Sequence, residues 1–116
     1  MAKHNQLGKE GELIALHFLK TEGFSILETN WRSQKAEIDI IIQDKKTLAL
    51  VEVKTRSSKK FGRPEEAITN KKQSLMQDAA EAYLAEKGFD YEIRFDVVSI
   101  ILDEKEGSIE HIKNAF

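Results

Sequence analysis

The sequence predicts an α/β fold in which a mixed sheet of four or five strands is flanked by two helices. A helical pattern near the N-terminus is followed by three apolar strand patterns, a second helical pattern and a long strand pattern. This order is typical of helices and strands that pack in layers around a shared core. A chain of 116 residues, 41% of them hydrophobic, is expected to form a single domain over residues 1–116.

The first helix is expected over residues 6–22, ended by Gly23, a residue suited to the left-handed turn after a helix. Its buried stripe is predicted to contain Leu7, Gly11, Ile14 and Phe18. The second helix is expected to begin at Thr69 or Asn70, either of which can act as its N-cap, and to run to about residue 87. Its apolar stripe is predicted to contain Ile68, Leu75, Ala79 and Ala82.

Strands are expected over residues 24–32, 37–43, 47–54 and 91–102, and a short edge strand over 108–112. The polar stretch 44–46 is a turn signal, which predicts an antiparallel hairpin between the second and third strands. Residues whose numbers sum to about 91 then face each other across this hairpin. The polar, basic stretch 55–64 is expected to be a loop.

This hairpin brings two acids and a lysine to one place. Asp39 is predicted to lie opposite Glu52, and Lys54 shares the face of Glu52 because side chains two apart on a strand point the same way. Two carboxylates and the Val53 carbonyl are oxygen ligands of the kind that Mg²⁺ prefers. A metal there can activate water for phosphodiester cleavage, and Lys54 can orient that water or stabilise developing charge.

An ordinary surface ion pair between Asp39 and Lys54 is the alternative. The apolar sequences around both acids favour a site, because carboxylates inside central strands are costly unless they are paired or bind a metal. Glu12 lies beside the first helix stripe, either as a further metal ligand or as an ordinary helix carboxylate. Lys71 lies between Ile68 and Leu75, and either reaches the site or extends to solvent.

A basic segment follows the acidic centre. From residue 54 to residue 72 there are seven basic and two acidic residues, a balance of +5, whereas the whole chain carries −2. Such a segment is either a phosphate-binding surface or a solvated loop and helix start. Its basic side chains other than Lys54 are Arg56, Lys59, Lys60, Arg63, Lys71 and Lys72.

Other polar and aromatic residues are assigned structural roles. Trp31 is expected in the core at a strand end rather than stacked on a base. Asp96 is expected either to form an ion pair, with Arg94 on its own strand face as the candidate partner, or to face a turn. The chain has no cysteine, no apolar run long enough to cross a membrane and no signal-peptide pattern at its start. A soluble cytoplasmic protein is the expectation.

Several motifs together resemble the YraN-like family of small bacterial proteins, over essentially the whole chain. The matching segments are Gly8-Lys9-Glu10-Gly11-Glu12, Asn30-Trp31-Arg32, Glu37-Ile38-Asp39, Val51-Glu52-Val53-Lys54-Thr55-Arg56, Phe61-Gly62-Arg63-Pro64, Lys71 and Arg94-Phe95-Asp96-Val97-Val98. This family is similar to the PD-(D/E)xK nucleases and to archaeal Holliday-junction resolvases. The resemblance implies a restriction-endonuclease-like αβββαβ core.

The resemblance also implies an active site made of Glu12, Asp39, Glu52 and Lys54, with Mg²⁺ or Mn²⁺ as cofactor. The leading hypothesis is therefore a metal-dependent endonuclease acting on DNA, with branched DNA as one candidate substrate. The alternatives are a non-catalytic nucleic-acid-binding module and a protein-interaction module with the same fold. The edge near residues 108–112 can also support a homodimer.

Overall fold

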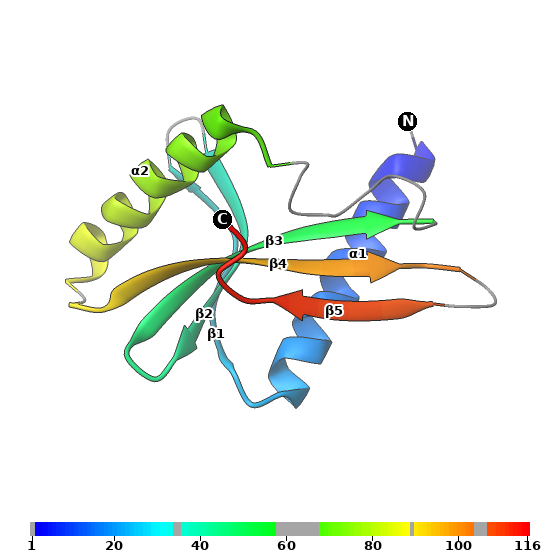
Figure 1. Cartoon of the computed structure of the whole chain (residues 1–116), viewed down its shortest axis with the longest axis horizontal. Coiled ribbons are helices and arrows are strands. Elements are labelled where there is room, and N and C mark those ends of the chain that lie inside the picture. The colour runs from blue at the N-terminus through cyan, green and yellow to red at the C-terminus, as the bar shows by residue number, and fades with distance from the viewer. Residues whose placement is uncertain (1, 34–35, 58–67, 89, 104–106) are drawn as a thin grey trace.

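The computed structural model describes residues 2–33, 36–57, 68–88, 90–103 and 107–116, with side chains from residue 7 onward. Its elements follow the order α1 (Ala2–Thr21), β1 (Ser25–Ser33), β2 (Ala36–Asp44), β3 (Thr47–Arg56), α2 (Asn70–Lys87), β4 (Glu92–Ile101) and β5 (Ser108–Ile112). The predicted order of helices and strands is confirmed, including the short fifth strand (Figure 1). No helix in the described part of the chain is long and apolar enough to cross a membrane.

The five strands form one mixed sheet in the order β1-β2-β3-β4-β5. β3 and β4 are parallel, since α2 connects them, and the other neighbouring pairs are antiparallel. In the β2–β3 hairpin Ile40 pairs with Val51 and Asp44 with Thr47, so the predicted register is confirmed. β1 and β5 form the two edges.

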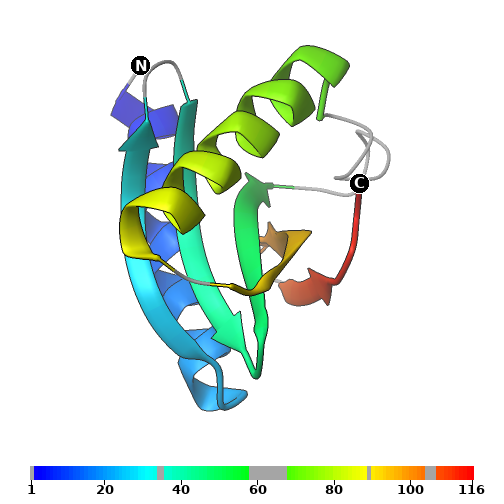
Figure 2. The same ribbon diagram turned by 90° about the vertical axis from the view of Figure 1, so that its left-hand side faces the viewer.

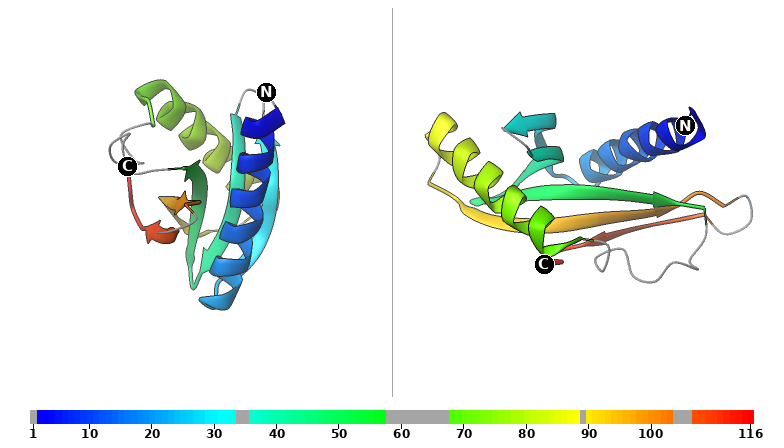
Figure 3. Two further views of the ribbon diagram at one scale, coloured as in Figure 1. Left: turned by 90° about the vertical axis from the view of Figure 1, so that its right-hand side faces the viewer. Right: turned by 90° about the horizontal axis from the view of Figure 1, so that it is seen from above.

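The helices cover opposite faces of the twisted sheet (Figures 2 and 3). One core lies between the sheet and α2, and its buried members from the helix are Met76, Ala79, Ala80 and Tyr83. The second core lies between the sheet and α1, to which Ala15 and Leu19 belong. Trp31 packs against the α2 core with its ring edge-on to Tyr83, at 5.2 Å between ring centroids, which confirms the predicted core position.

The alternation of β2 breaks at Asp39. Ile38 packs in the α2 core, whereas Ile40 and Ile42 pack in the α1 core. Residues two apart on a regular strand share a face, so the strand must change its twist between Ile38 and Ile40. The ladder with β3 ends at the same place, at the pair Ile40–Val51. β2 and β3 therefore separate beyond this pair, away from their connecting turn (Figure 2).

The predicted stripe of α1 is partly wrong. Gly11 is buried as expected, but Ile14 is 38% exposed and the stripe continues through Ala15 and Leu19. The reason is close approach: a Cβ at Gly11 would lie 2.8 Å from the Thr55 Cβ and would overlap its hydroxyl. The smallest residues, rather than the largest apolar ones, therefore face β3 at this end of the helix.

The predicted stripe of α2 is also displaced. Ile68 and Ala79 are buried, but Ala82 is exposed and Leu75 is only partly buried. Thr69 is the N-cap, because its hydroxyl accepts a hydrogen bond from the Lys72 N–H, and Gly88 ends the helix in a left-handed conformation. Counting back four residues from Met76 places Lys72, rather than Lys71, on the buried side.

Two glycines of α1 test this contact. Gly11→Ala should lower the free energy of unfolding by about 1–3 kcal/mol, since the added methyl overlaps a β-branched side chain of a strand. Gly8→Ala is the matched control, because a Cβ there has no atom within 4 Å and alanine favours the helix by about 1 kcal/mol. Urea denaturation of both variants is the measurement. Equal effects would show that Gly11 is not in close contact with β3.

Candidate functional site

Asp39 stands where β2 and β3 separate, and its side chain completes the hydrogen bonding there. The Val53 N–H donates to Asp39 Oδ2 at 2.8 Å, beyond the last backbone pair of the hairpin. Asn30 of β1 lies level with Asp39 and has a φ of 51°, a left-handed conformation that is uncommon outside glycine. At the level of Asp39, therefore, β1 has an irregular backbone and β2 no longer pairs with β3.

Glu52 lies on β3 on the α2 side of the sheet and is 5% exposed. Its Oε1 accepts a hydrogen bond of 2.6 Å from the ammonium group of Lys72. Its Oε2 is buried and has no hydrogen-bond partner in the described structure. A buried carboxylate oxygen without a donor is costly, so this oxygen is available for a further positively charged group.

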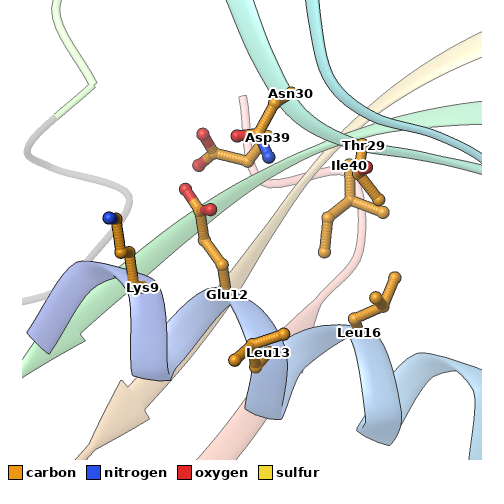
Figure 4. Close-up of a pocket in the computed structure, with 8 residues that line it drawn as sticks. All are labelled: Lys9, Glu12, Leu13, Leu16, Thr29, Asn30, Asp39 and Ile40. Carbon is orange, nitrogen blue, oxygen red and sulfur yellow. The ribbon is translucent and has the colours of Figure 1, made fainter. Parts of the chain in front are cut away.

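Glu12 reaches the same region from α1, on the other side of the sheet. With Asp39 it lines a cavity of about 280 Å³, whose apolar wall is formed by Leu13, Leu16 and Ile40. The carboxylates of Glu12 and Asp39 point toward one another in Figure 4. Burial raises the pKa of Glu12, and so do the charges of Glu37 and Glu52, whereas a hydrogen bond from the Asn30 side chain lowers it.

The electrostatics of Asp39 show how closely the acids are coupled. Burial and then the charge of Glu52 raise the pKa of Asp39 from 3.8 to about 7, against the opposing hydrogen bond from Val53. The charge of Glu12 raises this pKa further, and that of Lys72 lowers it. Asp39 is thus poised to change its protonation near neutral pH, as groups at functional sites often are.

The lysine in contact with the acids is Lys72, which the sequence patterns did not single out. Lys71, one residue earlier, is exposed, and both lysines line a cavity at the start of α2 with Glu37 and Thr69. The signal that locates Lys72 is its spacing of four residues from the buried Met76. Lys54 is half-buried on the same strand face as Glu52, and it forms no ion pair with any residue that the structure describes.

The donor set suits a hard divalent cation by its chemistry, because carboxylate oxygens are the preferred ligands of Mg²⁺ and Mn²⁺. The described residues do not, however, include three acidic or histidine side chains gathered as a ready cluster. The charges of Glu12 and Glu52 act on Asp39, but the three carboxylates do not form one coordination shell in the described structure. Binding by all three would require side-chain rotation, for which the half-exposed Glu12 has room.

Of the predicted phosphate-binding residues, Arg56 is half-buried at the end of β3 and Lys71 is exposed on α2. Lys59, Lys60 and Arg63 lie outside the described residues. Asp96 pairs with Arg94 as predicted, through Nε at 2.8 Å and a second nitrogen at 2.9 Å. This ion pair lies on β4, where Asp96 pairs with Val51, the residue before Glu52. It holds the C-terminal segment, because the Asn114 N–H also donates to Asp96.

A five-stranded mixed sheet with one helix on each face is compatible with a restriction-endonuclease-like core. Residues 11–100 match the uncharacterised protein family UPF0102, the family of the YraN-like proteins, so the resemblance read from the motifs is confirmed. The chain belongs to this family.

Its relatives match over nearly their full lengths. A UPF0102 protein of Flavobacterium psychrophilum is 49% identical over 100% of this chain and 98% of the relative. One from Christiangramia forsetii is 44% identical with the same coverage, and one from Alkaliphilus oremlandii is 42% identical over 97% of this chain and 99% of its own length. The family is thus defined over the same segment that contains all four predicted site residues.

The raised pKa of Asp39 predicts a stability that falls as pH rises. The native protein binds this proton more tightly than the unfolded chain, so the penalty develops between pH 3.8 and about 7. Asp39→Asn keeps an oxygen for the Val53 N–H and removes the charge. It should therefore raise the free energy of unfolding by roughly 2 kcal/mol near pH 8, and by much less near pH 4.

Urea denaturation in EDTA at both pH values measures this difference. Asp78→Asn, at an exposed position of α2, is the control for losing one carboxylate. A gain of stability from Asp39→Asn that is the same at both pH values would contradict the assigned burial of the Asp39 charge.

Proposed function

We propose that this protein is a metal-dependent endonuclease that hydrolyses phosphodiester bonds in DNA. The observation that carries the proposal is the coupling of Asp39 and Glu52 at the divergence of β2 and β3, with Glu12 reaching them from α1. Burial and the neighbouring negative charges raise the pKa values of Asp39 and Glu12, so the ionised carboxylates are destabilising by themselves. Their arrangement is useful to a protein that recruits positive charge to this place.

A divalent cation, Mg²⁺ or Mn²⁺, would compensate two unfavourable features of the site, an unpaired carboxylate oxygen and a carboxylate whose ionised form is disfavoured. It would provide a partner for the unsatisfied Glu52 Oε2, and it would favour the ionised form of Asp39. We assign Asp39 and Glu52 as its ligands, and Glu12 as the carboxylate that completes the shell. When bound, such a cation supplies charge neutralisation at the phosphate and a bound water of lowered pKa.

Lys54 is assigned the orientation of the attacking water. It follows Glu52 by two residues and therefore projects on the same side of β3. The side chain is half-buried without an ion pair to the described residues, so its ammonium is available to a water or to an oxygen that gains charge. Arg56 and Lys71, with the basic residues 59, 60 and 63, are assigned to the phosphate backbone.

Structure-selective action on branched DNA is the form of activity that we favour. The excess of basic residues between positions 54 and 72 favours contact through phosphates, which carries no sequence information by itself. A homodimer would suit a two-fold symmetric junction, and the exposed edge strand β5 is the surface that we propose for it.

The Glu52→Ala variant tests the nuclease. Cleavage of linear, flapped and four-way-junction DNA should need Mg²⁺ or Mn²⁺, stop in EDTA, and fall at least roughly a hundredfold in Glu52→Ala, as for loss of a principal charge-stabilising group. Glu81→Ala is the matched control, because Glu81 is an exposed carboxylate on α2, outside the proposed dimer surface. Cleavage that persists in a clean Glu52→Ala preparation would reject the assigned site.

A binding module without catalysis is the second candidate, and the balance of +5 between residues 54 and 72 favours it. It predicts DNA binding that weakens with salt and needs no metal. Replacing Lys59, Lys60 and Arg63 by glutamine should reduce the slope of log affinity against log salt by about 0.9 for each phosphate that the protein no longer neutralises. Binding with an unchanged slope would exclude this segment as the DNA surface, whether or not the protein cuts.

A further inference from the structure

Lys72 is the positive charge nearest to the buried acids. Its ammonium lies 2.6 Å from Glu52 Oε1, where the Glu52 side chain is 7% exposed and the Lys72 side chain is 40% exposed. The charge of Lys72 also acts on Asp39. The Lys72 side chain thus pairs with a buried carboxylate while it remains partly exposed to solvent.

The backbone of Lys72 is held, whereas its side chain has room. Its N–H donates to the Thr69 Oγ1 at 3.1 Å, so its Cα is fixed in the first turn of α2. The cavity of about 350 Å³ that Lys72 lines with Lys71, Thr69 and Glu37 lies beside it. A lysine has four flexible side-chain carbons, so its ammonium can leave Glu52 for this cavity without movement of the helix.

Lys72 and a divalent cation are alternative positive partners for Glu52. Without a metal, the buried Glu52 needs a positive partner, and Lys72 supplies one. A cation between Asp39 and Glu52 would bring two positive charges close to the ammonium, and repulsion in a partly buried site is strong.

We propose that Lys72 is the internal counter-ion of the metal-free site, that it competes with the divalent cation for Glu52, and that its ammonium leaves Glu52 when the cation binds. This inference rests on the metal site of the proposed function. It makes Lys72 a positioning residue, distinct from Lys54. It also assigns different roles to two adjacent lysines of α2, since Lys71 does not contact the acids.

Mn²⁺ binding without DNA tests the competition. Titration calorimetry near pH 8 should show Lys72→Met binding Mn²⁺ at least about fivefold more tightly than the natural protein, a coupling at the low end of those seen between interacting sites. The rise in Tm caused by Mn²⁺ should be larger in Lys72→Met for the same reason. Lys71→Met loses the same charge from the neighbouring position and should leave Mn²⁺ affinity within about twofold.

The outcomes separate the two proposals. Equal or weaker Mn²⁺ binding by Lys72→Met would overturn the competition while leaving the metal site in place. Failure of the natural protein and of both variants to bind Mn²⁺ or Mg²⁺ would overturn the metal site itself. An equal gain in Mn²⁺ affinity in Lys72→Met and Lys71→Met would show that the effect comes from the loss of any nearby positive charge. It would also overturn the competition.

A measurement on the natural protein covers the case in which Lys72→Met does not fold. The ¹⁵N signals of the lysine ammonium groups report their ion pairs directly. Mg²⁺ should shift the Lys72 Nζ signal toward that of a solvated lysine and leave the Lys71 signal unchanged. A Lys72 signal that stays at its metal-free position after Mg²⁺ has saturated the site would overturn the proposal.

Discussion

The hydrogen bond from the Val53 N–H to the Asp39 carboxylate is the interaction on which the site depends. This hydrogen bond connects β2 and β3 just beyond the point where their backbones no longer pair. Once the strands separate there, a side chain from either face of the sheet can approach the gap. Glu12 approaches from the α1 side and Lys72 from the α2 side, so one local irregularity joins both layers of the fold.

Asp96 and Asp39 show how the surroundings of a carboxylate set its pKa. Asp96 is fully buried, and burial raises its pKa. Hydrogen bonds from His111 and Arg94 outweigh burial, so the pKa of Asp96 lies below the ordinary value. Asp39 has a single backbone donor and two acidic neighbours, and its pKa rises to about 7. The first arrangement stabilises the fold, whereas the second is stable only at a cost that a bound cation would remove.

The sequence patterns predict the carboxylates of the site but not the lysine that pairs with Glu52. The hairpin register follows from the turn at residues 44–46 and the period of two, so the approach of Asp39 to Glu52 was predictable. The predicted stripe of α2 passes through Leu75 and Ala82, about 100° around the helix from the side that is buried. Lys72 lies on the buried side and therefore outside the predicted stripe. In a helix with so many alanines and charges, apolar spacing does not define a unique face.

The sequence by itself determined the family, the order of helices and strands, the hairpin and the carboxylates that it brings together. These follow from local periodicity, turn chemistry and motifs, which act over a few residues. Only the tertiary structure decided that β2 changes face at Asp39, that Gly11 rather than Ile14 meets β3, and that Lys72 engages Glu52. Each of these depends on packing between segments far apart in the chain, which local patterns do not encode.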